Sequence, residues 1–197
     1  MKERLSSLPL DGLEQGQFTL IDGKVQEIAR DISLAKDNLS LPARICDSIR
    51  QFKYREHNPA EFRQRTGSQI WKSGYVTGCT DCALAAIVVA RALRQPCFYT
   101  ETVREGALKK PQPWKDGHIF VDFVVDGGIV PYSPRKSNPL KDYFAAGEKY
   151  IVFGRGIDFS SLFFLDHKSG LYFPEPIILQ TNEDAEAIAR EYYGWER

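Results

Sequence analysis

The stretch that decides the fold is CTDCALAAIVVARAL, which runs from Cys79 to Leu93. Its middle, residues 83–90, contains only apolar or small side chains. A helix that is apolar around its whole circumference has no face suited to solvent and must be buried. Pro96 follows shortly afterwards and cannot continue a helix. We therefore predict a central buried helix, with Thr77 or Thr80 as its N-terminal cap.

The residues before this helix predict further helices. Apolar side chains recur at helical spacing over about 41–53. Proline is tolerated in the first turn of a helix, so a second helix is expected over 59–72, ended by Gly74. Residues 1–35 are polar, and the short alternating run 18–22 is compatible with either a strand or an irregular lead-in.

The residues after the buried helix predict a sheet. Asp126-Gly127-Gly128 is typical of a tight hairpin turn, and Gly154–Gly156 is expected to form another turn. An amphipathic helix is expected over 182–194. We predict strands over 97–103, 118–125, 129–132 and 149–153. The fold class is therefore α+β, with the buried helix packed on an antiparallel sheet in a single domain over 1–197.

The composition is that of an ordinary globular protein. The 197 residues are 43% hydrophobic and 26% charged, which excludes a disordered, collagen-like or coiled-coil chain. Basic and acidic residues both number 26, so the formal net charge is zero. Nucleic acids and anionic membranes select a cationic surface, and this balance favours neither as a partner.

The compartment expected from the sequence is the cytoplasm. The longest apolar run, 83–90, is far shorter than the roughly 20 residues that span a bilayer. The first residues, MKERLSSLPLDGLEQG, lack the apolar core of a signal peptide. The four cysteines are too few and too clustered for the disulfide framework of a secreted mini-domain, so reduced thiols are expected.

Cys79 and His118 have the placement that nucleophilic catalysis requires. Cys79 starts the buried helix, where unpaired amides and the helix dipole lower the pKa of a thiol. The same amides are suited to hold an oxyanion. His118 starts the strongest predicted strand, where it is suited to accept the thiol proton. The simpler interpretation is a buried structural thiol and an ordinary strand-end histidine.

Other residues near this pair have alternative interpretations. Cys79 and Cys82 form a C-x-x-C pair, which is found in zinc and redox sites, but a second ligand pair and a βαβ context are missing. Trp71 and Tyr75 are candidates for lining a substrate cleft, although core packing explains them equally well. Asp122 lies four residues after His118, so alternation places both on one face of the strand.

Two blocks of the sequence resemble the transglutaminase-like superfamily, which belongs to the papain-like cysteine enzymes. They are GCTDCALAAIVVARALRQPC (78–97) and GHIFVDFVVDGGIVPYSP (117–134), and GRGID (154–158) also resembles prokaryotic members. The resemblance covers a core of about 40–165, with 1–39 as an N-terminal extension. It implies that Cys79 is the nucleophile and His118 the general base of an enzyme acting on amide or peptide bonds. It implies no cofactor and no metal, and a protein or peptide as substrate.

The sequence departs from the family at the third catalytic position. The family has an aspartate before a proline, and this chain has Ser133 there; Ile129 replaces a tryptophan on the same strand. A serine can orient an imidazole but brings no negative charge. Ser133 is therefore the candidate orienting residue, with Asp122 as another candidate. The chain is either a cysteine hydrolase or acyltransferase, or an impaired or inactive binding module, and its oligomeric state stays open.

The resemblance also predicts the geometry of the site. We expect the Cys79 sulfur about 3.5–4 Å from one ring nitrogen of His118. Counting outward from the hairpin turn places His118 opposite residues 132–134, so the other ring nitrogen should face Ser133 or a backbone carbonyl there.

Overall fold

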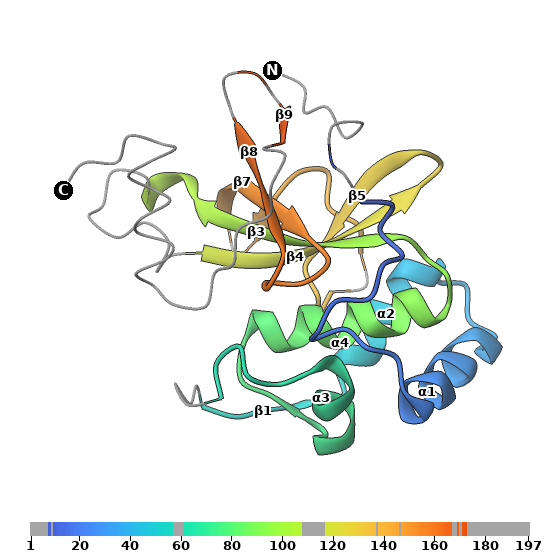
Figure 1. Ribbon diagram of the computed structural model, residues 1–197. Coiled ribbons are helices and arrows are strands. Elements are labelled where there is room, and N and C mark those ends of the chain that lie inside the picture. Colours follow the sequence, from blue (N-terminus) through green and yellow to red (C-terminus); the bar gives the residue numbers. More distant parts are fainter. Residues whose placement is uncertain are drawn as a thin grey trace.

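The predicted buried helix is α4 (Cys79–Ala92), which lies at the centre of the computed structural model in Figure 1. Residues 83–90 are all 0% exposed, so the expected burial is confirmed. The N-cap is Gly78, and no side chain caps the helix. The prediction of Thr77 or Thr80 as the cap was wrong because the Thr77 hydroxyl instead donates to Asp81, in the first turn of the helix.

The structure describes residues 8, 10–56, 61–107, 117–136, 138–145, 147–166, 169 and 171–172. The helix expected over 182–194 lies outside these residues, as does Pro59, which was expected to open a helix.

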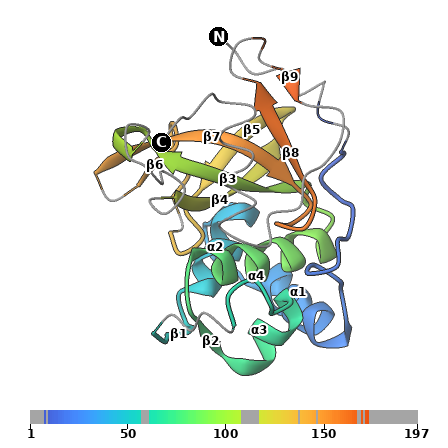
Figure 2. The ribbon, with the colours of Figure 1, turned by 60° about the vertical axis from the view of Figure 1, so that its left-hand side comes forward.

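A single antiparallel sheet packs on α4. Its strand order is β5-β4-β3-β7-β8-β9, with β6 pairing with β7. Figures 1 and 2 show that the sheet is curled. The bounds are β3 Cys97–Arg104, β4 Gly117–Val125, β5 Gly128–Tyr132, β6 Phe144–Ala145, β7 Glu148–Gly156, β8 Leu162–Asp166 and β9 Leu171–Tyr172. A 3-10 turn, Glu105–Ala107, follows β3. The fold is therefore α+β with an antiparallel sheet, as the element order predicted.

The hairpin turn was predicted correctly. Asp126 and Gly127 both have positive φ, +51° and +75°, as a two-residue type I′ turn requires, and Val125 pairs with Gly128 across it. The turn expected at Gly154–Gly156 was wrong, because both glycines lie within β7. A Cβ on Gly156 would lie 2.0 Å from the Ser161 carbonyl oxygen, so this glycine permits a close approach of backbones instead of a turn.

In the described part of the chain, three more helices lie on the same side of the sheet as α4 (Figures 1 and 2). They are α1 (Gly23–Leu34), α2 (Leu41–Ile49) and α3 (Gly67–Ser73). The sequence predicted α2 at nearly the observed bounds, placed α3 too early, and missed α1. A short parallel pair, β1 (Lys53–Tyr54) and β2 (Tyr75–Val76), leads the chain to the start of α4.

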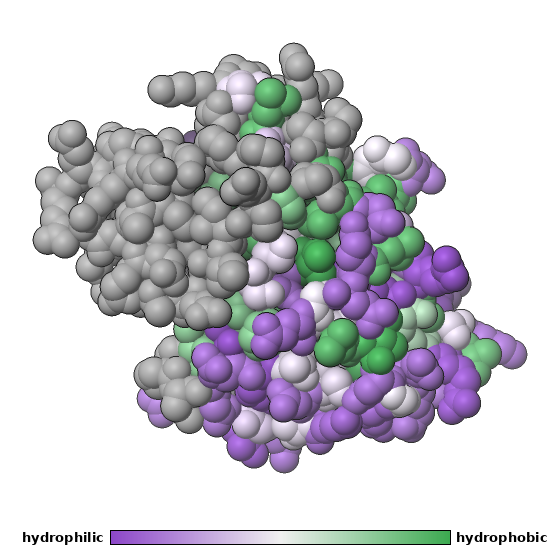
Figure 3. Space-filling view, viewed as in Figure 1, coloured by the Kyte–Doolittle hydropathy of each residue, from purple (hydrophilic) through white to green (hydrophobic). Residues whose placement is uncertain are grey.

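The helical layer buries its apolar side chains against α4 and the sheet. Val25, Ile45 and Ile70, one from each of the three outer helices, are 0% exposed. In Figure 3 hydrophilic residues accordingly cover most of the lower half of the molecule, where the helices lie. Among the described residues, no helix has the length and apolar character needed to cross a bilayer.

Candidate active site

Cys79 is the first residue of α4 and the point where the buried helix reaches the surface of the domain. As a whole residue it is partly exposed, whereas residues 80–91, which follow it in the helix, are buried. The backbone N–H groups of Thr80 and Ile119 lie at its sulfur. Ile119 directly follows His118 at the start of β4, so the sulfur lies beside the strand that carries the histidine.

The resting thiol of Cys79 is neutral. Burial raises its pKa above the ordinary value, and this outweighs the backbone hydrogen bonds from Ile119 and Thr80 that act in the opposite direction. The pKa lowered by the helix N-terminus, which the sequence predicted, was therefore wrong. Backbone amides do lie at the sulfur, but they stabilise a thiolate less than burial destabilises it.

His118 lies near the start of β4 (Gly117–Val125), as predicted. Its Nε2 lies 3.3 Å from the Ser133 hydroxyl oxygen. The imidazole ring packs edge-on against Phe120, with centroids 4.8 Å apart, and in a tilted arrangement against Tyr150, with centroids 5.6 Å apart. These contacts hold the ring on two sides. The ring nitrogen beside Ser133 is Nε2, and Nδ1 is the other nitrogen.

His118 is also neutral at rest. Burial, and to a lesser extent the positive charge of Lys136, lowers its pKa to about 4. A thiolate–imidazolium pair is therefore disfavoured in the resting site. The neutral imidazole remains able to accept a proton during a reaction.

The pKa of His118 predicts a pH dependence of stability. Between pH 6.5 and about 4 the unfolded chain binds a proton that the folded chain excludes. The contribution of His118 to stability is full above pH 6.5 and falls as the pH drops through this window, by up to about 3 kcal/mol. Urea unfolding of the wild type and His118→Gln at several pH values measures this. A slope that survives unchanged in His118→Gln would contradict the assignment.

Ser133 follows the end of β5, and hairpin register explains its position. The β4–β5 ladder extends to Val121↔Tyr132. If the same register is extended beyond the ladder, Ser133 lies opposite Phe120 and His118 lies opposite residue 135. The sequence had placed His118 opposite residues 132–134. Diagonal neighbours on one face of a sheet are within reach of long side chains. The predicted contact between His118 and Ser133 is present for this reason.

Cys79 and His118 line one cleft of about 420 Å³. The wall also contains two aromatic side chains, Tyr54 and Phe62, which are 63% and 38% exposed. The remaining lining residues are Thr77, Gly78, Thr80 and Asp81. The predicted 3.5–4 Å contact between the sulfur and the imidazole stays a prediction, but the two side chains do face a common space.

The structure does not bring Trp71 and Tyr75 to this cleft. Trp71 is 7% exposed, donates from Nε1 to the Ala85 carbonyl oxygen at 2.9 Å, and packs against Phe52. The Tyr75 hydroxyl donates to Glu61 Oε2 at 3.0 Å, and its ring contacts the guanidinium groups of Arg55 and Arg65. Trp71 is therefore a core-packing residue. The aromatic residues that do line the cleft, Tyr54 and Phe62, were not predicted because they belong to no periodic sequence pattern.

Asp122 does not orient His118 in this structure. Its Oδ2 accepts from Arg155 Nε and from the Tyr143 hydroxyl, both at 2.6 Å. Asp122 and Arg155 are 0% and 1% exposed, so the carboxylate is held in a buried ion pair. Asp122 and His118 share a face of β4 as predicted, and Ser133 is the group at the histidine ring.

A second ion pair, missed from the sequence, lies beside Cys79. Arg63 Nη2 donates to Glu101 Oε1 at 2.7 Å, and both side chains are about 10% exposed. The Glu101 carboxylate raises the pKa of the Cys79 thiol, and the Cys79 thiol in turn raises the pKa of Arg63. One sequence feature could have predicted this ion pair. Glu101 is a charged residue on the face of β3 whose other residues, Cys97, Tyr99 and Val103, belong to the core around α4.

The C-x-x-C pair is not arranged as a metal site. Cys82 is 3% exposed in the core, and burial raises its pKa to about 12. Within the described ranges, no group of three or more histidine, cysteine, aspartate or glutamate side chains is placed to hold a metal ion.

Comparisons with known proteins identify the fold. No family model matches the sequence, and no curated protein matches it. A candidate cysteine protease from Cytophaga hutchinsonii is similar in structure, with a TM-score of 0.55 and 22% identity over 77% of this chain and 49% of that chain. Calcium-bound LapG of Legionella pneumophila has a TM-score of 0.51 and 14% identity, covering 87% of this chain and 100% of that chain.

The chain therefore spans about half the length of the Cytophaga protein that it matches. At these identities the likeness concerns the fold alone. The mixed arrangement of helices and a curled antiparallel sheet is one that this chain shares with a protein described as a candidate cysteine protease.

Proposed function

We propose that this chain is a papain-like cysteine enzyme of the transglutaminase-like type, which cleaves or transfers an acyl group from an amide or peptide bond. The observation that carries the proposal is the cleft shared by Cys79, at the N-terminus of α4, and His118, at the start of β4. Cys79 is the nucleophile, His118 the general base, and Ser133 the group that orients the imidazole. The fold shared with the Cytophaga protein supports this assignment.

The proposed reaction starts from a neutral thiol and a neutral imidazole. His118 Nδ1 takes the thiol proton as the Cys79 sulfur bonds to the carbonyl carbon, and the carbonyl oxygen becomes an oxyanion. The carbon–nitrogen bond then breaks, and the leaving amine takes the proton from His118. Water or an amine attacks the resulting thioester, gives its proton to His118 and displaces the sulfur, which recovers that proton.

The backbone N–H groups of Thr80 and Ile119 are suited to stabilise the oxyanion. They already lie at the sulfur, and α4 has no side-chain cap to occupy its first amides. Preorganised amides aimed at developing negative charge are commonly the largest single contribution to catalysis.

The accessibility of the nucleophile is tested by alkylation. Treated with iodoacetamide near neutral pH, Cys79 is expected to react faster than Cys46 because Cys79 is partly exposed and lines the cleft. Cys46 is 0% exposed, and burial raises its pKa well above the ordinary value. Peptide mapping by mass spectrometry measures both sites in one sample. Equal rates at the two cysteines would contradict the proposal.

A second function, a binding module that has lost catalysis, is favoured by one specific observation. The group at His118 Nε2 is the uncharged Ser133, and the pKa of His118 is about 4, so the imidazolium lacks the carboxylate that would stabilise it. A chain of this kind would bind a peptide in the cleft without turnover. Measurable acylation of Cys79 distinguishes the enzyme from the module.

The partner and compartment belong to the same proposal. We take the substrate to be a protein or peptide, since the resemblance is to enzymes that act on such bonds, and we take the compartment to be the cytoplasm. The proposed chemistry uses side chains and water and includes no cofactor.

A further inference from the structure

A single carboxylate ties the first turn of α4 to the loop that precedes it. Asp81 is the third residue of the helix and is 4% exposed. Its Oδ2 accepts from the backbone N–H of Thr77 at 2.9 Å and from the Thr77 hydroxyl at 3.0 Å. Thr77 and Gly78 immediately precede Cys79, so these two bonds fix the approach of the chain to the proposed nucleophile.

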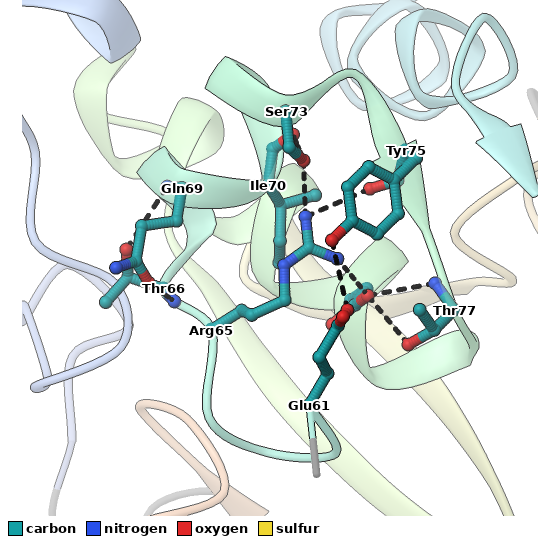
Figure 4. A network of polar contacts seen from close by, with 9 residues as sticks. Glu61, Arg65, Thr66, Gln69, Ile70, Ser73, Tyr75 and Thr77 are labelled. Atoms are coloured by element: carbon teal, nitrogen blue, oxygen red, sulfur yellow. Dashed lines mark hydrogen bonds and ion pairs between the residues drawn. The ribbon is translucent and has the colours of Figure 1, made fainter. Parts of the chain in front are cut away.

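Arg65 completes this contact from another part of the fold. Its Nη1 donates to the same Asp81 oxygen at 2.9 Å, and the two side chains are 11% and 5% exposed. Its Nη2 contacts the Ser73 hydroxyl and the Tyr75 carbonyl oxygen (Figure 4). Arg65 therefore joins both ends of α3 and the strand β2 to the carboxylate.

The Tyr75 ring connects this network to the cleft wall. The ring lies 4.1 Å from the Arg65 guanidinium and 3.8 Å from that of Arg55. Its hydroxyl donates to Glu61 Oε2 at 3.0 Å, as Figure 4 shows. Glu61 precedes Phe62 of the cleft wall. Tyr75 therefore links Arg65 to the segment that carries Phe62.

The ion pair also sets the charge next to the sulfur. Asp81 is two residues from Cys79 in the same turn, and both line the cleft. An unneutralised carboxylate in the same helical turn and the same cleft wall would oppose the negative charge that develops on the sulfur. Arg65 neutralises the carboxylate while leaving its hydrogen bonds to Thr77 in place.

We propose that Asp81 is a positioning residue for Cys79 and that Arg65 is the charge partner that lets the buried thiol lose its proton beside this carboxylate. The inference rests on the proposed role of Cys79 as the nucleophile. It adds two residues that touch neither the substrate nor the reacting atoms and act through the placement and charge environment of the sulfur.

The test is the pH profile of Cys79 alkylation by iodoacetamide in three variants. In Arg65→Met the isolated carboxylate is expected to slow alkylation about three- to tenfold at mildly alkaline pH and to move the profile to higher pH. In Asp81→Asn the isolated guanidinium is expected to speed it by a similar factor and to move the profile to lower pH. In the double variant both charges are gone and the profile should return close to the wild type.

Opposite signs in the two single variants are the decisive result, because a purely structural role would move both in one direction. Equal or absent shifts would overturn the proposal. If Arg65→Met fails to fold, as thermal unfolding will show, the sign of the shift in Asp81→Asn decides the question. The three variants retain the other titratable or charged groups around the sulfur, which are Arg63, Cys82, Tyr99, Glu101 and His118.

Asp22→Asn is the matched control. Asp22 caps α1, accepting from the Val25 backbone N–H, and like Asp81 it pairs with a cation, Lys72 at 2.7 Å, but it lies far along the chain from α4. It should leave the Cys79 profile unchanged, and a shift as large as that of Asp81→Asn would overturn the proposal. Alkylation of Cys79 requires no turnover, so this test is independent of enzyme activity. If the chain proves inactive but Arg65→Met and Asp81→Asn still shift the alkylation profile in opposite directions, the proposed function is wrong and the proposed charge effect of Arg65 and Asp81 stands.

Discussion

Replacing Ser133 by aspartate is expected to raise the rate at which Cys79 is acylated by about 10²-fold. The side chain at this position lies 3.3 Å from His118 Nε2, so a carboxylate there would stabilise the imidazolium that forms when the thiol gives up its proton. Loss of charge at the equivalent position of a serine-protease triad costs about 10⁴-fold in turnover, and part of that factor should be recoverable here.

The measurement is the release of p-nitrophenol from p-nitrophenyl acetate, together with the pKa of His118 by NMR. The pKa of His118 should rise from about 4 in the variant. Ser133→Asn is the matched control, since an amide can orient the ring without supplying charge, and it should give only a small gain. An aspartate variant that folds normally and changes neither the rate nor the pKa would show that His118 is not the base.

Replacing His118 by alanine is expected to slow acylation of Cys79 about 10³-fold, because a positioned general base contributes about 10²–10⁴-fold. The neutral imidazole takes the thiol proton in the proposed reaction, and no other described side chain is assigned that role. Free imidazole added to the variant should restore part of the rate.

His57→Ala is the control for this variant. His57 lies in the polar run YREHN (54–58), far along the chain from His118, and its replacement should leave the rate at the wild-type value. If His118→Ala acylates at the wild-type rate, the thiol reacts without a base and the Cys–His assignment fails.

The parts of the fold that could be predicted depend on local sequence. The apolar circumference of 83–90 identified the buried helix, and the turn at Asp126 and Gly127 fixed the strand register that brings Ser133 to His118. Register is a local property once the turn is known, so this contact between residues 15 apart followed from counting.

The parts that were missed depend on contacts between distant residues. Arg65 and Asp81 are 16 residues apart, and Arg63 and Glu101 are 38 apart, and no periodicity connects them. The neutral resting thiol was missed for a related reason. Its pKa depends on how much of the sulfur the rest of the fold covers, which the position of Cys79 at a helix N-terminus does not reveal.

Helix α1 is a different kind of omission, because its signals are present in the sequence. Asp22 caps the helix, and Val25, Ala29 and Ile32 form its buried face at helical spacing. The polar composition of residues 1–35 concealed this narrow apolar stripe, which is all that a helix on the surface of a domain requires.

The most direct test of the central claim is the intact mass of the chain after brief exposure to p-nitrophenyl acetate near neutral pH. The account predicts that the wild type gains a single acetyl group, which peptide mapping places on Cys79 and hydroxylamine removes as expected of a thioester. Cys79→Ala should gain none under the same conditions. Acetylation of Cys79→Ala to the wild-type extent, or a wild type that stays unmodified at Cys79, would contradict the claim that this cysteine is the nucleophile.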